Sequence, residues 1–307
     1  MVQPIERIAV VGAGAMGSVY AAKFFEMDKN CIALVAKGER CARLKAQGLT
    51  VNDKHYALPV LEVEEKTPPH DLIIVAVKHH HLPQAIQDVK NRVGDHTVIL
   101  SVMNGIESEE KIGAVYGMER VLYAVAVGID ALRRENRTTY STQGKLYFGE
   151  AENHDLTERV TRIQSLFDRA GLVHETPEDM IRILWWKFMI NVGTNQASAV
   201  LRAPFAILQT SQEARELMES AMQEVMAVAE AKNVHLSQAD LDSWFSVLSG
   251  LSPEGRPSML QDVEAKRKTE VEMFAGKMIQ LGKALNIPVP VNEAFFRIIK
   301  VIEDHYD

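Results

Sequence analysis

Cysteine is scarce in this 307-residue sequence, which contains only Cys31 and Cys41. Two cysteines cannot build a disulfide framework, and this usage is typical of proteins from a reducing compartment. Long hydrophobic runs are also absent: the longest run near a predicted strand, residues 72–77, has six residues, whereas a membrane span needs ~18. An apolar strand pattern begins already at residue 8, so we expect no signal peptide. These absences predict a cytoplasmic protein.

An excess of positive charge is missing as well. Lys and Arg total 34 against 41 Asp and Glu, which gives a formal net charge of −7. Nucleic-acid binding needs a concentrated basic surface, so this balance argues against a nucleic-acid partner. An apolar fraction of 47% with 24% charged residues is typical of a globular protein. At about 100–200 residues per domain, the length predicts roughly two domains.

The N-terminal part alternates short β-branched runs with helical stretches, such as 18–26 and 82–93. This alternation predicts a mostly parallel sheet with helices on both faces. Residues 139–149 predict a hairpin or antiparallel edge strands that finish the sheet. The predicted buried strands are 8–11, 32–35, 72–77, 98–102 and 121–127.

From Pro177 onward strand signals almost vanish, and Met, Ala, Glu and Leu dominate. This change predicts a dinucleotide-binding domain at 1–177 and an all-helical substrate domain at 178–307. The long C-terminal helices can pack on each other or across a homodimer, and periodicity does not separate these cases. The predicted helices are 179–200, 211–232, 238–248, 259–285 and 292–304.

A glycine turn with the pattern G-x-G-x-x-G follows the first strand and opens a helix. In this context the pattern predicts a Rossmann-type cofactor site. The first glycine permits the tight turn, the second lets the backbone approach a pyrophosphate, and the third lets the helix pack on the strand. A turn without any ligand is the alternative. The turn comprises Gly12, Ala13, Gly14, Ala15, Met16 and Gly17.

The end of the second strand distinguishes NAD from NADP. An NAD site places an acidic residue there to bind the ribose 2′-hydroxyl. This sequence has Ala36 and Lys37 instead, with Arg40 shortly after. Such residues favour NADP because cations suit a 2′-phosphate. Glu39 lies close enough to keep NAD as an alternative.

A polar stripe marks the otherwise apolar helix predicted at 179–200. Lys187, Asn191, Asn195 and Ser198 recur at helical spacing on one side. Buried amines and amides need partners, so the stripe indicates a polar cleft or an internal network. In a substrate cleft the lysine can donate a proton, and the asparagines can bind oxygen atoms of a substrate.

Two further polar residues lie in the segment predicted as the helix 259–285. Glu270 falls on the same side of that helix as Met259 and Val263. A buried carboxylate there needs a cation, for which Lys187 is the candidate; a surface glutamate is the alternative. Ser258, with Gln261 three residues later, forms a capping-box pattern that needs no ligand.

Taken together and in order, these motifs resemble those of the ketopantoate reductase (2-dehydropantoate 2-reductase) family, over essentially the whole sequence. The shared segments are the glycine turn at 12–17, then 34–38, 76–78, Asn104–Gly105, Trp186–Lys187 with Asn191 and Asn195, and 258–262 with Glu270 twelve residues after the serine. The family reduces 2-dehydropantoate to pantoate with NADPH, a step toward pantothenate and coenzyme A.

The resemblance also implies residue roles. Lys187 would be the general acid, with Glu270 holding it and binding the substrate hydroxyl. Asn191, Asn195 and Ser258 would bind the substrate. Lys78 and Asn104 would lie near the nicotinamide, with Asn104 also close to the substrate. Lys37 would take the place, near the 2′-phosphate, where the family usually has arginine.

Two features depart from the family pattern. Phe205 follows Pro204 where some members have asparagine, and three histidines, His79, His80 and His81, follow Lys78. Adjacent histidines point in different directions, so we expect no metal site. Phe205 motivates an alternative, a paralogue that reduces a different 2-oxoacid. A non-catalytic NADP-binding regulator is a third hypothesis, against which the stripe at Lys187 argues.

Overall fold

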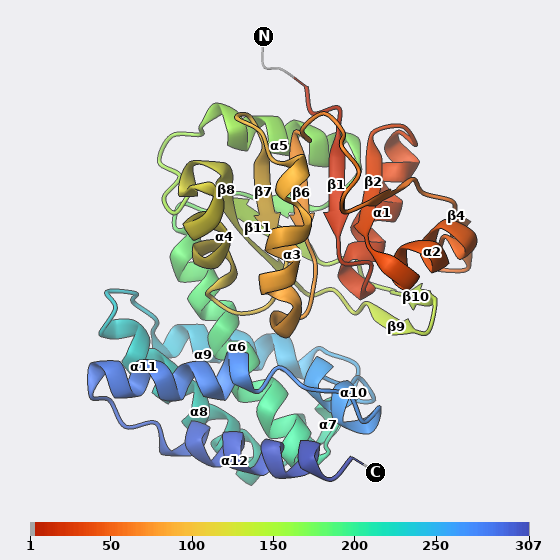
Figure 1. Ribbon diagram of the computed structural model, residues 1–307. Helices are drawn as coiled ribbons and strands as arrows, with labels where there is room; N and C mark the ends of the chain where they lie inside the picture. Colours follow the sequence, from red (N-terminus) through yellow and green to blue (C-terminus); the bar gives the residue numbers. More distant parts are fainter. Residues whose placement is uncertain (1–3, 307) are drawn as a thin grey trace. The chain divides into compact units, whose positions relative to one another are not determined.

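The computed structural model describes residues 4–306. The chain forms two compact units that divide between Ile183 and Leu184. This division falls inside helix α6 (Met180–Leu201), which therefore contributes residues to both units. Figure 1 shows strands and helices mixed in the first unit, and helices in the second.

The N-terminal unit contains an eight-stranded sheet with the order β12-β11-β8-β7-β6-β1-β2-β5. Six neighbouring strands of this sheet, β8-β7-β6-β1-β2-β5, are all parallel to one another. Their order is that of a Rossmann sheet. This confirms the predicted fold class. The bounds are β1 (Ile8–Val11), β2 (Ile32–Ala36), β5 (Val60–Glu62), β6 (Leu72–Val75), β7 (Val98–Ser101), β8 (Val121–Val127), β11 (Lys145–Gly149) and β12 (His174–Glu175).

Helices cover both faces of this sheet because its strands are apolar on both sides. In β1, Ile8 and Val10 face a core that includes residues of α1 and α5, whereas Ala9 and Val11 face a core that includes residues of α3 and α4. All four of these β1 residues are buried. The helices are α1 (Ala15–Met27), α2 (Gly38–Gln47), α3 (Leu82–Asp88), α4 (Ser108–Tyr116) and α5 (Glu158–Arg169), with 3-10 turns at His79–His81, Lys90–Arg92 and Met118–Arg120.

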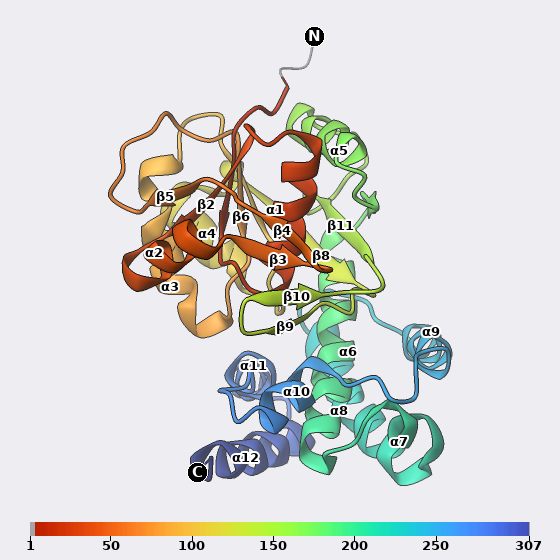
Figure 2. The same cartoon turned by 90° about the vertical axis from the view of Figure 1, so that its right-hand side faces the viewer.

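The expectation for residues 139–149 is partly wrong. Strand β11 does pair antiparallel with β8, but β12 adds outside it in parallel, so β11 is not the edge. Strand β10, where the predicted hairpin begins, belongs to a second, four-stranded sheet in the order β4-β3-β10-β9, visible beside α1 in Figure 2. Its strands are β3 (Leu49–Val51), β4 (Lys54–Tyr56), β9 (Leu132–Arg134) and β10 (Arg137–Thr139).

The second unit consists of helices joined by loops and contains no strand within its described residues, 184–306. The predicted single helix at 259–285 is wrong: the chain leaves α10 at Ala265, Lys266 takes a positive φ of 51°, and a π-helical turn starts only at Glu272. Within residues 4–306, none of the helices is both long and apolar enough to cross a membrane. The elements are α6, α7 (Phe205–Thr210), α8 (Gln212–Glu230), α9 (Gln238–Ser249), α10 (Ser258–Glu264), the π turn (Glu272–Gly276), α11 (Lys277–Leu285) and α12 (Pro290–Asp304).

Candidate active site

The glycine turn joins β1 to α1, and its three glycines have different surroundings. Gly12 has a φ of +100°, and a Cβ there would lie 2.4 Å from the Ala76 carbonyl oxygen. A Cβ on Gly17 would lie 1.9 Å from the Gly12 oxygen. Around Gly14, by contrast, the nearest atom to an added Cβ is the Ala76 oxygen at 3.9 Å. The chain itself therefore requires Gly12 and Gly17, while Gly14 keeps space open at the start of α1.

This open space has the chemistry of an anion site. Gly14 is the N-cap of α1, and no acidic side chain lies in the first turn of that helix. Backbone N–H groups at a helix N-terminus attract phosphate because they lack intrahelical partners. The residues at 12–17 thus fit the pyrophosphate of a dinucleotide.

Polar residues follow the ends of the neighbouring strands at the same edge of the sheet. Val75 of β6 pairs in register with Val11 of β1 and with Ser101 of β7. Lys78 lies three residues after Val75, and Asn104 lies three residues after Ser101. Both side chains are half-buried. The carboxyl ends of parallel strands are where open α/β sheets bind ligands. The predicted residues Lys78 and Asn104 therefore share this edge with the glycine turn.

The end of β2 carries no acidic side chain. Strand β2 ends at Ala36, and Lys37 is the exposed N-cap of α2. The Lys37 ammonium lies 3.4 Å from a carboxylate oxygen of Asp88, an oxygen that also accepts a hydrogen bond from Gln84 at 2.8 Å. Lys37 is therefore placed as predicted beside the second strand, but it is already paired within the unit.

Lys187 lies in the middle of α6, in the helical unit. It is half-buried, between the buried residues Trp185 and Phe188. Burial lowers the pKa of Lys187 to about 8 from an ordinary value of 10.5, because removal from water penalises the ammonium form. A lysine with this pKa carries a proton at neutral pH and can release it more easily than an exposed lysine.

Three of the predicted substrate residues form one hydrogen-bonded group. The Asn195 amide donates to the Asn191 side-chain oxygen at 3.1 Å. The Asn195 oxygen accepts from the Ser258 hydroxyl at 2.9 Å and from the Met259 N–H at 3.3 Å. Asn191 and Asn195 are both buried, and Ser258 is exposed. Asn195 thereby fixes the start of α10 to the middle of α6.

The capping-box interpretation of Ser258 is wrong. The N-cap of α10 is Pro257, and Ser258 is the first residue of the helix, without a side-chain cap. The Gln261 amide donates instead to the Arg256 carbonyl oxygen at 2.8 Å. The last residue of the stripe, Ser198, donates to the Ala203 carbonyl and so serves the end of α6.

Glu270 is buried, so it is not the surface glutamate that was the alternative. The reason given for its burial was wrong, however, because α10 ends at Glu264 and the predicted helix face does not exist. It lies in the link between α10 and the π turn, and its carbonyl accepts from the N–H groups of Met273 and Phe274. Thr269, next to it, donates its N–H and hydroxyl to Glu303 of α12 at 2.7 and 2.6 Å. The link is thus held from α12 rather than by helical structure.

A buried amide network beside the stripe was missed by sequence reasoning. Gln196 donates to Asn292 at 3.2 Å and accepts from the Ala275 N–H at 3.0 Å. Asn292 in turn donates to the Glu224 carboxylate at 2.7 Å. Gln196 lies on α6 but off the i, i+4 stripe, and its partners are far away in the sequence. No local signal could have found them.

The three histidines form a 3-10 turn directly before α3. His79 is half-buried, while His80 and His81 are exposed with ring centroids 4.1 Å apart. In the part of the chain from 4 to 306, no group of three or more His, Cys, Asp or Glu side chains is arranged to hold a metal ion.

Comparison with known proteins gives the same family over both units. Residues 8–153 match the family "Ketopantoate reductase PanE/ApbA", and residues 179–303 match "Ketopantoate reductase PanE/ApbA C terminal". A 2-dehydropantoate 2-reductase of Aquifex aeolicus is 26% identical and covers 97% of either chain. A crystal structure of 2-dehydropantoate 2-reductase from Geobacter metallireducens, 25% identical, superposes with a TM-score of 0.85 over 96% of this chain and 99% of that one.

A D-mandelate dehydrogenase, solved with NADH and anilino(oxo)acetate, has the same fold. Its TM-score is 0.88 over 98% of this chain and 99% of that chain, at 21% identity. The two folded units are therefore found together in enzymes that carry different substrate names.

Proposed function

Because this chain belongs to the ketopantoate reductase family, we propose that it is an NADPH-dependent 2-oxoacid reductase. Its proposed substrate is 2-dehydropantoate, reduced to pantoate on the route to pantothenate and coenzyme A. The observation that carries the proposal is Lys187: a half-buried lysine whose pKa burial lowers to about 8, on the same helix as the linked amides Asn191 and Asn195.

The cofactor, when bound, supplies a hydride to the ketone carbon. Negative charge then builds on the ketone oxygen, and Lys187 stabilises that charge and gives its Nζ proton to the oxygen. At neutral pH the ammonium is the main form of a lysine with this pKa, so the proton is present when it is needed.

The amides and the carboxylate position the reactants. Asn191 and Asn195 bind oxygen atoms of the substrate, and Ser258, joined to Asn195 at 2.9 Å, binds the substrate from the start of α10. Glu270 binds the substrate hydroxyl and orients Lys187. Asn104 serves both the substrate and the nicotinamide end of the cofactor.

The cofactor is held by the N-terminal unit. The turn at 12–17 binds the pyrophosphate, which is supported by the space around Gly14 and by the helix N-terminus behind it. Lys78 lies at the same sheet edge. Strand β2 ends at Ala36 rather than at an acidic residue, and Lys37 follows it. Both features favour NADPH over NADH.

The test is NADPH oxidation followed by absorbance with a panel of 2-oxoacids. We expect the highest kcat/KM with 2-dehydropantoate and a loss of turnover in Lys187→Ala. NADPH binding without turnover on any member of the panel would instead support the non-catalytic regulator.

A second substrate is favoured by one observation. Phe205 opens α7, donates its N–H to the Gly255 oxygen at 2.9 Å, and packs its ring so close that a Cβ on Gly255 would lie 2.8 Å from it. This aromatic ring thus packs against the loop that leads to Ser258. A higher kcat/KM for an aromatic or branched 2-oxoacid than for 2-dehydropantoate would favour the paralogue.

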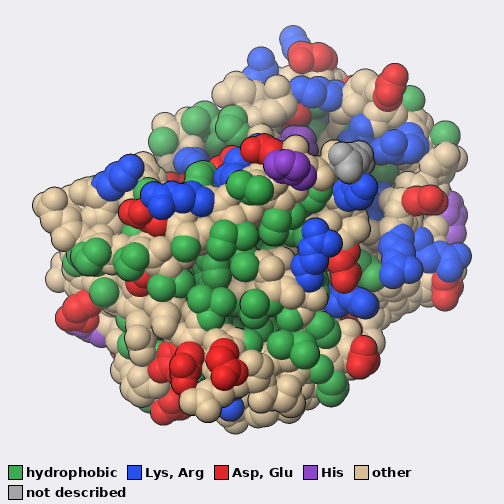
Figure 3. Space-filling view, turned by 90° about the horizontal axis from the view of Figure 1, so that it is seen from below, with side chains coloured by type: hydrophobic (Ala, Val, Ile, Leu, Met, Phe, Trp, Pro, Cys, Tyr) green, Lys and Arg blue, Asp and Glu red, His purple; other side chains and the backbone are tan. Residues whose placement is uncertain are grey.

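We also propose that the protein forms a homodimer. The face in Figure 3 shows many hydrophobic side chains close together, and exposed apolar surface of this kind is typical of association sites. Ile298 and Val301, which lie one turn apart on α12, are both exposed. Sedimentation velocity at micromolar concentration checks this, and a single monomeric species would contradict it.

A further inference from the structure

Three arginines of the N-terminal unit lie close enough to repel one another. Arg40 and Arg43 belong to α2, and Arg133 belongs to β9. Burial lowers the pKa of Arg133, and the charges of Arg40 and Arg43 lower it further. The pKa of Arg40 is lowered in the same way, by burial and then by Arg43. Like charges held together in this manner destabilise one another.

This cluster contains no neutralising carboxylate. Arg133 donates its Nε to the Glu135 carbonyl and its Nη1 to the Ser18 hydroxyl, each at 2.9 Å, and both acceptors are neutral. Neither Arg40 nor Arg43 forms an ion pair or hydrogen bond through its side chain with any other residue in the range 4–306. Although Arg40 is partly desolvated, both Arg40 and Arg43 keep solvent-exposed surface, so an incoming anion can reach them.

The cluster lies beside the glycine turn. Ser18, which binds Arg133, directly follows Gly17 and is fully buried in the first part of α1. Arg40 lies in the first turn of α2, directly after β2. In a Rossmann unit, the end of β2 is where the adenosine ribose of a dinucleotide is bound.

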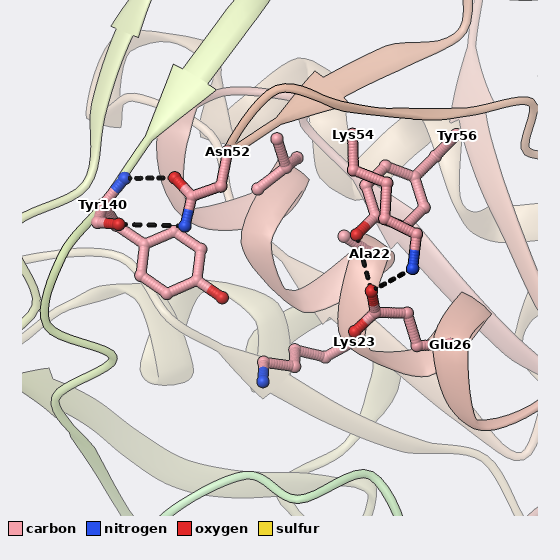
Figure 4. Close-up of a pocket in the computed structure, with 8 residues that line it drawn as sticks. Ala22, Lys23, Glu26, Asn52, Lys54, Tyr56 and Tyr140 are labelled. Atoms are coloured by element: carbon pink, nitrogen blue, oxygen red, sulfur yellow. Dashed lines mark hydrogen bonds and ion pairs between the residues drawn. The ribbon is translucent and has the colours of Figure 1, made fainter.

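The hairpin β9–β10 is fixed in place, so Arg133 is presented by a rigid element. Asn136, in its turn, donates to Gln47 of α2. Figure 4 shows Asn52 bound through its side chain to the backbone of Tyr140, with both distances 2.9 Å.

The same sheet is attached to α1 at a second point. Glu26 of α1 accepts hydrogen bonds from Lys54 and Tyr56 of β4, each at 2.7 Å (Figure 4). These three residues line the small pocket there, and their bonds hold the sheet against α1. Rigid placement lowers the entropy cost of binding an anion.

We propose that Arg133, together with Arg40 and Arg43, binds the 2′-phosphate of NADPH. The inference rests on the proposed use of NADPH and identifies the residues that choose it over NADH. A phosphate monoester carries the double negative charge that the cluster lacks, and guanidinium groups bind it in a fork geometry that lysine cannot provide. Lys37, already 3.4 Å from Asp88, has the smaller part in this selection.

The experiment measures binding without any substrate. The dissociation constants of NADPH and NADH, and of the fragments adenosine 2′,5′-bisphosphate and 5′-AMP, are determined by calorimetry for the wild type, Arg133→Gln and Arg40→Gln. Arg134→Gln is the matched control, because Arg134 is the exposed neighbour in β9 and successive strand residues face opposite ways.

We expect Arg133→Gln to weaken NADPH and the bisphosphate roughly 10-fold or more, the loss typical of a charge-assisted hydrogen bond. NADH and 5′-AMP should change less than about twofold, and Arg134→Gln should change none of the four. Arg40→Gln removes a side chain without intramolecular bonds, so it reports on the cluster even if Arg133→Gln folds poorly.

Equal weakening of NADPH and NADH in both variants would overturn the assignment, as would a wild type that binds NADPH no more tightly than NADH. Wild-type protein that binds neither dinucleotide would overturn the proposed function itself. Tight NADPH binding that is unaffected by either variant would leave the proposed function standing and remove only the arginine cluster from it.

Discussion

The side-chain oxygen of Asn195 accepts a hydrogen bond from the Ser258 hydroxyl at 2.9 Å, across 63 positions of sequence. The same oxygen accepts from the Met259 N–H at 3.3 Å, one of the backbone donors that a helix N-terminus leaves without an intrahelical partner. Asn195 therefore acts as the cap that Pro257 cannot supply to α10. The residue proposed to bind substrate therefore also holds the start of α10 against α6.

A double-mutant cycle tests this relationship. Asn195→Ala should lower the free energy of unfolding by about 1–3 kcal/mol, because two donors lose their acceptor. Ser258→Ala should cost less, about 0.5–1.5 kcal/mol, since only one bond is lost. The coupling between them, measured by urea unfolding, should be about 0.5 kcal/mol or more. Strict additivity would show that the bond does not contribute in solution.

Replacing Lys187 should separate activity from stability. Lys187→Met should lower kcat by roughly 100-fold or more, because the proton donor acts in the transition state. Its Tm at pH 7 should stay the same or rise, since burial penalises the ammonium that is removed. Lys283→Met, at an exposed position of α11, is the control and should leave kcat unchanged. A large fall in Tm with Lys187→Met would mean that the lysine is structural.

The pH dependence of catalysis should follow the same lysine. kcat/KM should decline above about pH 8, as the folded protein loses the Lys187 proton. The contribution of Lys187 to the free energy of unfolding should change with pH in the opposite direction and increase as pH rises. The folded pKa lies below the ordinary value of 10.5, so the stability contribution of Lys187 is present above that value and is lost as pH falls through about 8. The wild-type free energy of unfolding minus that of Lys187→Met should therefore rise from pH 8 to 10.

The large sheet could be predicted because its signal is local. Strands buried on both faces must be apolar throughout, and the predicted strand at 121–127 matches β8 at both ends. The second sheet could not be predicted, because its strands have only three residues each and no period develops over that length. The sheet also joins segments that are far apart in the sequence, as the hydrogen bond from Asn52 to Tyr140, 88 positions away, illustrates.

At the break after α10, by contrast, the local pattern predicts a helix that the folded chain does not form. Residues 259–275 contain neither proline nor glycine, so the pattern continues as a helix. The positive φ at Lys266 and the bonds from Thr269 to Glu303 stop it, and the latter is a tertiary contact across 34 positions. The stripe of Asn191 and Asn195 could be predicted because it repeats within one helix, whereas Arg133 and Ser18 meet across 115 positions.

The buried carboxyl of Glu109 is linked by hydrogen bonds to Met103, the residue before Asn104. A chain of hydrogen bonds runs from the Met103 N–H to Ser101, on to Ser108 at 2.7 Å, and then to Glu109 at 2.8 Å. Burial raises the pKa of Glu109 to about 7. This carboxyl therefore contributes stability below its ordinary pKa that is lost as pH rises through about 7.

Glu109→Gln keeps the acceptor for Ser108 and removes the charge. Between pH 5 and pH 7 the wild type should lose stability relative to this variant, by about 1.4 kcal/mol for each unit over which the carboxyl ionises only on unfolding. Urea unfolding at several pH values measures the difference. Glu110→Gln, its exposed neighbour, is the control and should follow the wild type. Parallel pH curves for the wild type and Glu109→Gln would show that Glu109 ionises normally.

Two glycines of one turn should respond differently to the same substitution. Gly17→Ala places a Cβ 1.9 Å from the Gly12 oxygen, so it must move α1 away from β1 and should lower Tm by several degrees. Gly14→Ala meets nothing closer than 3.9 Å, so its Tm should stay near that of the wild type. If the space at Gly14 belongs to a pyrophosphate, Gly14→Ala should nevertheless weaken NADPH and NADH alike, as measured by calorimetry. Unchanged affinity in a stable Gly14→Ala protein would show that the phosphates lie elsewhere, because no folding defect could then hide a lost contact.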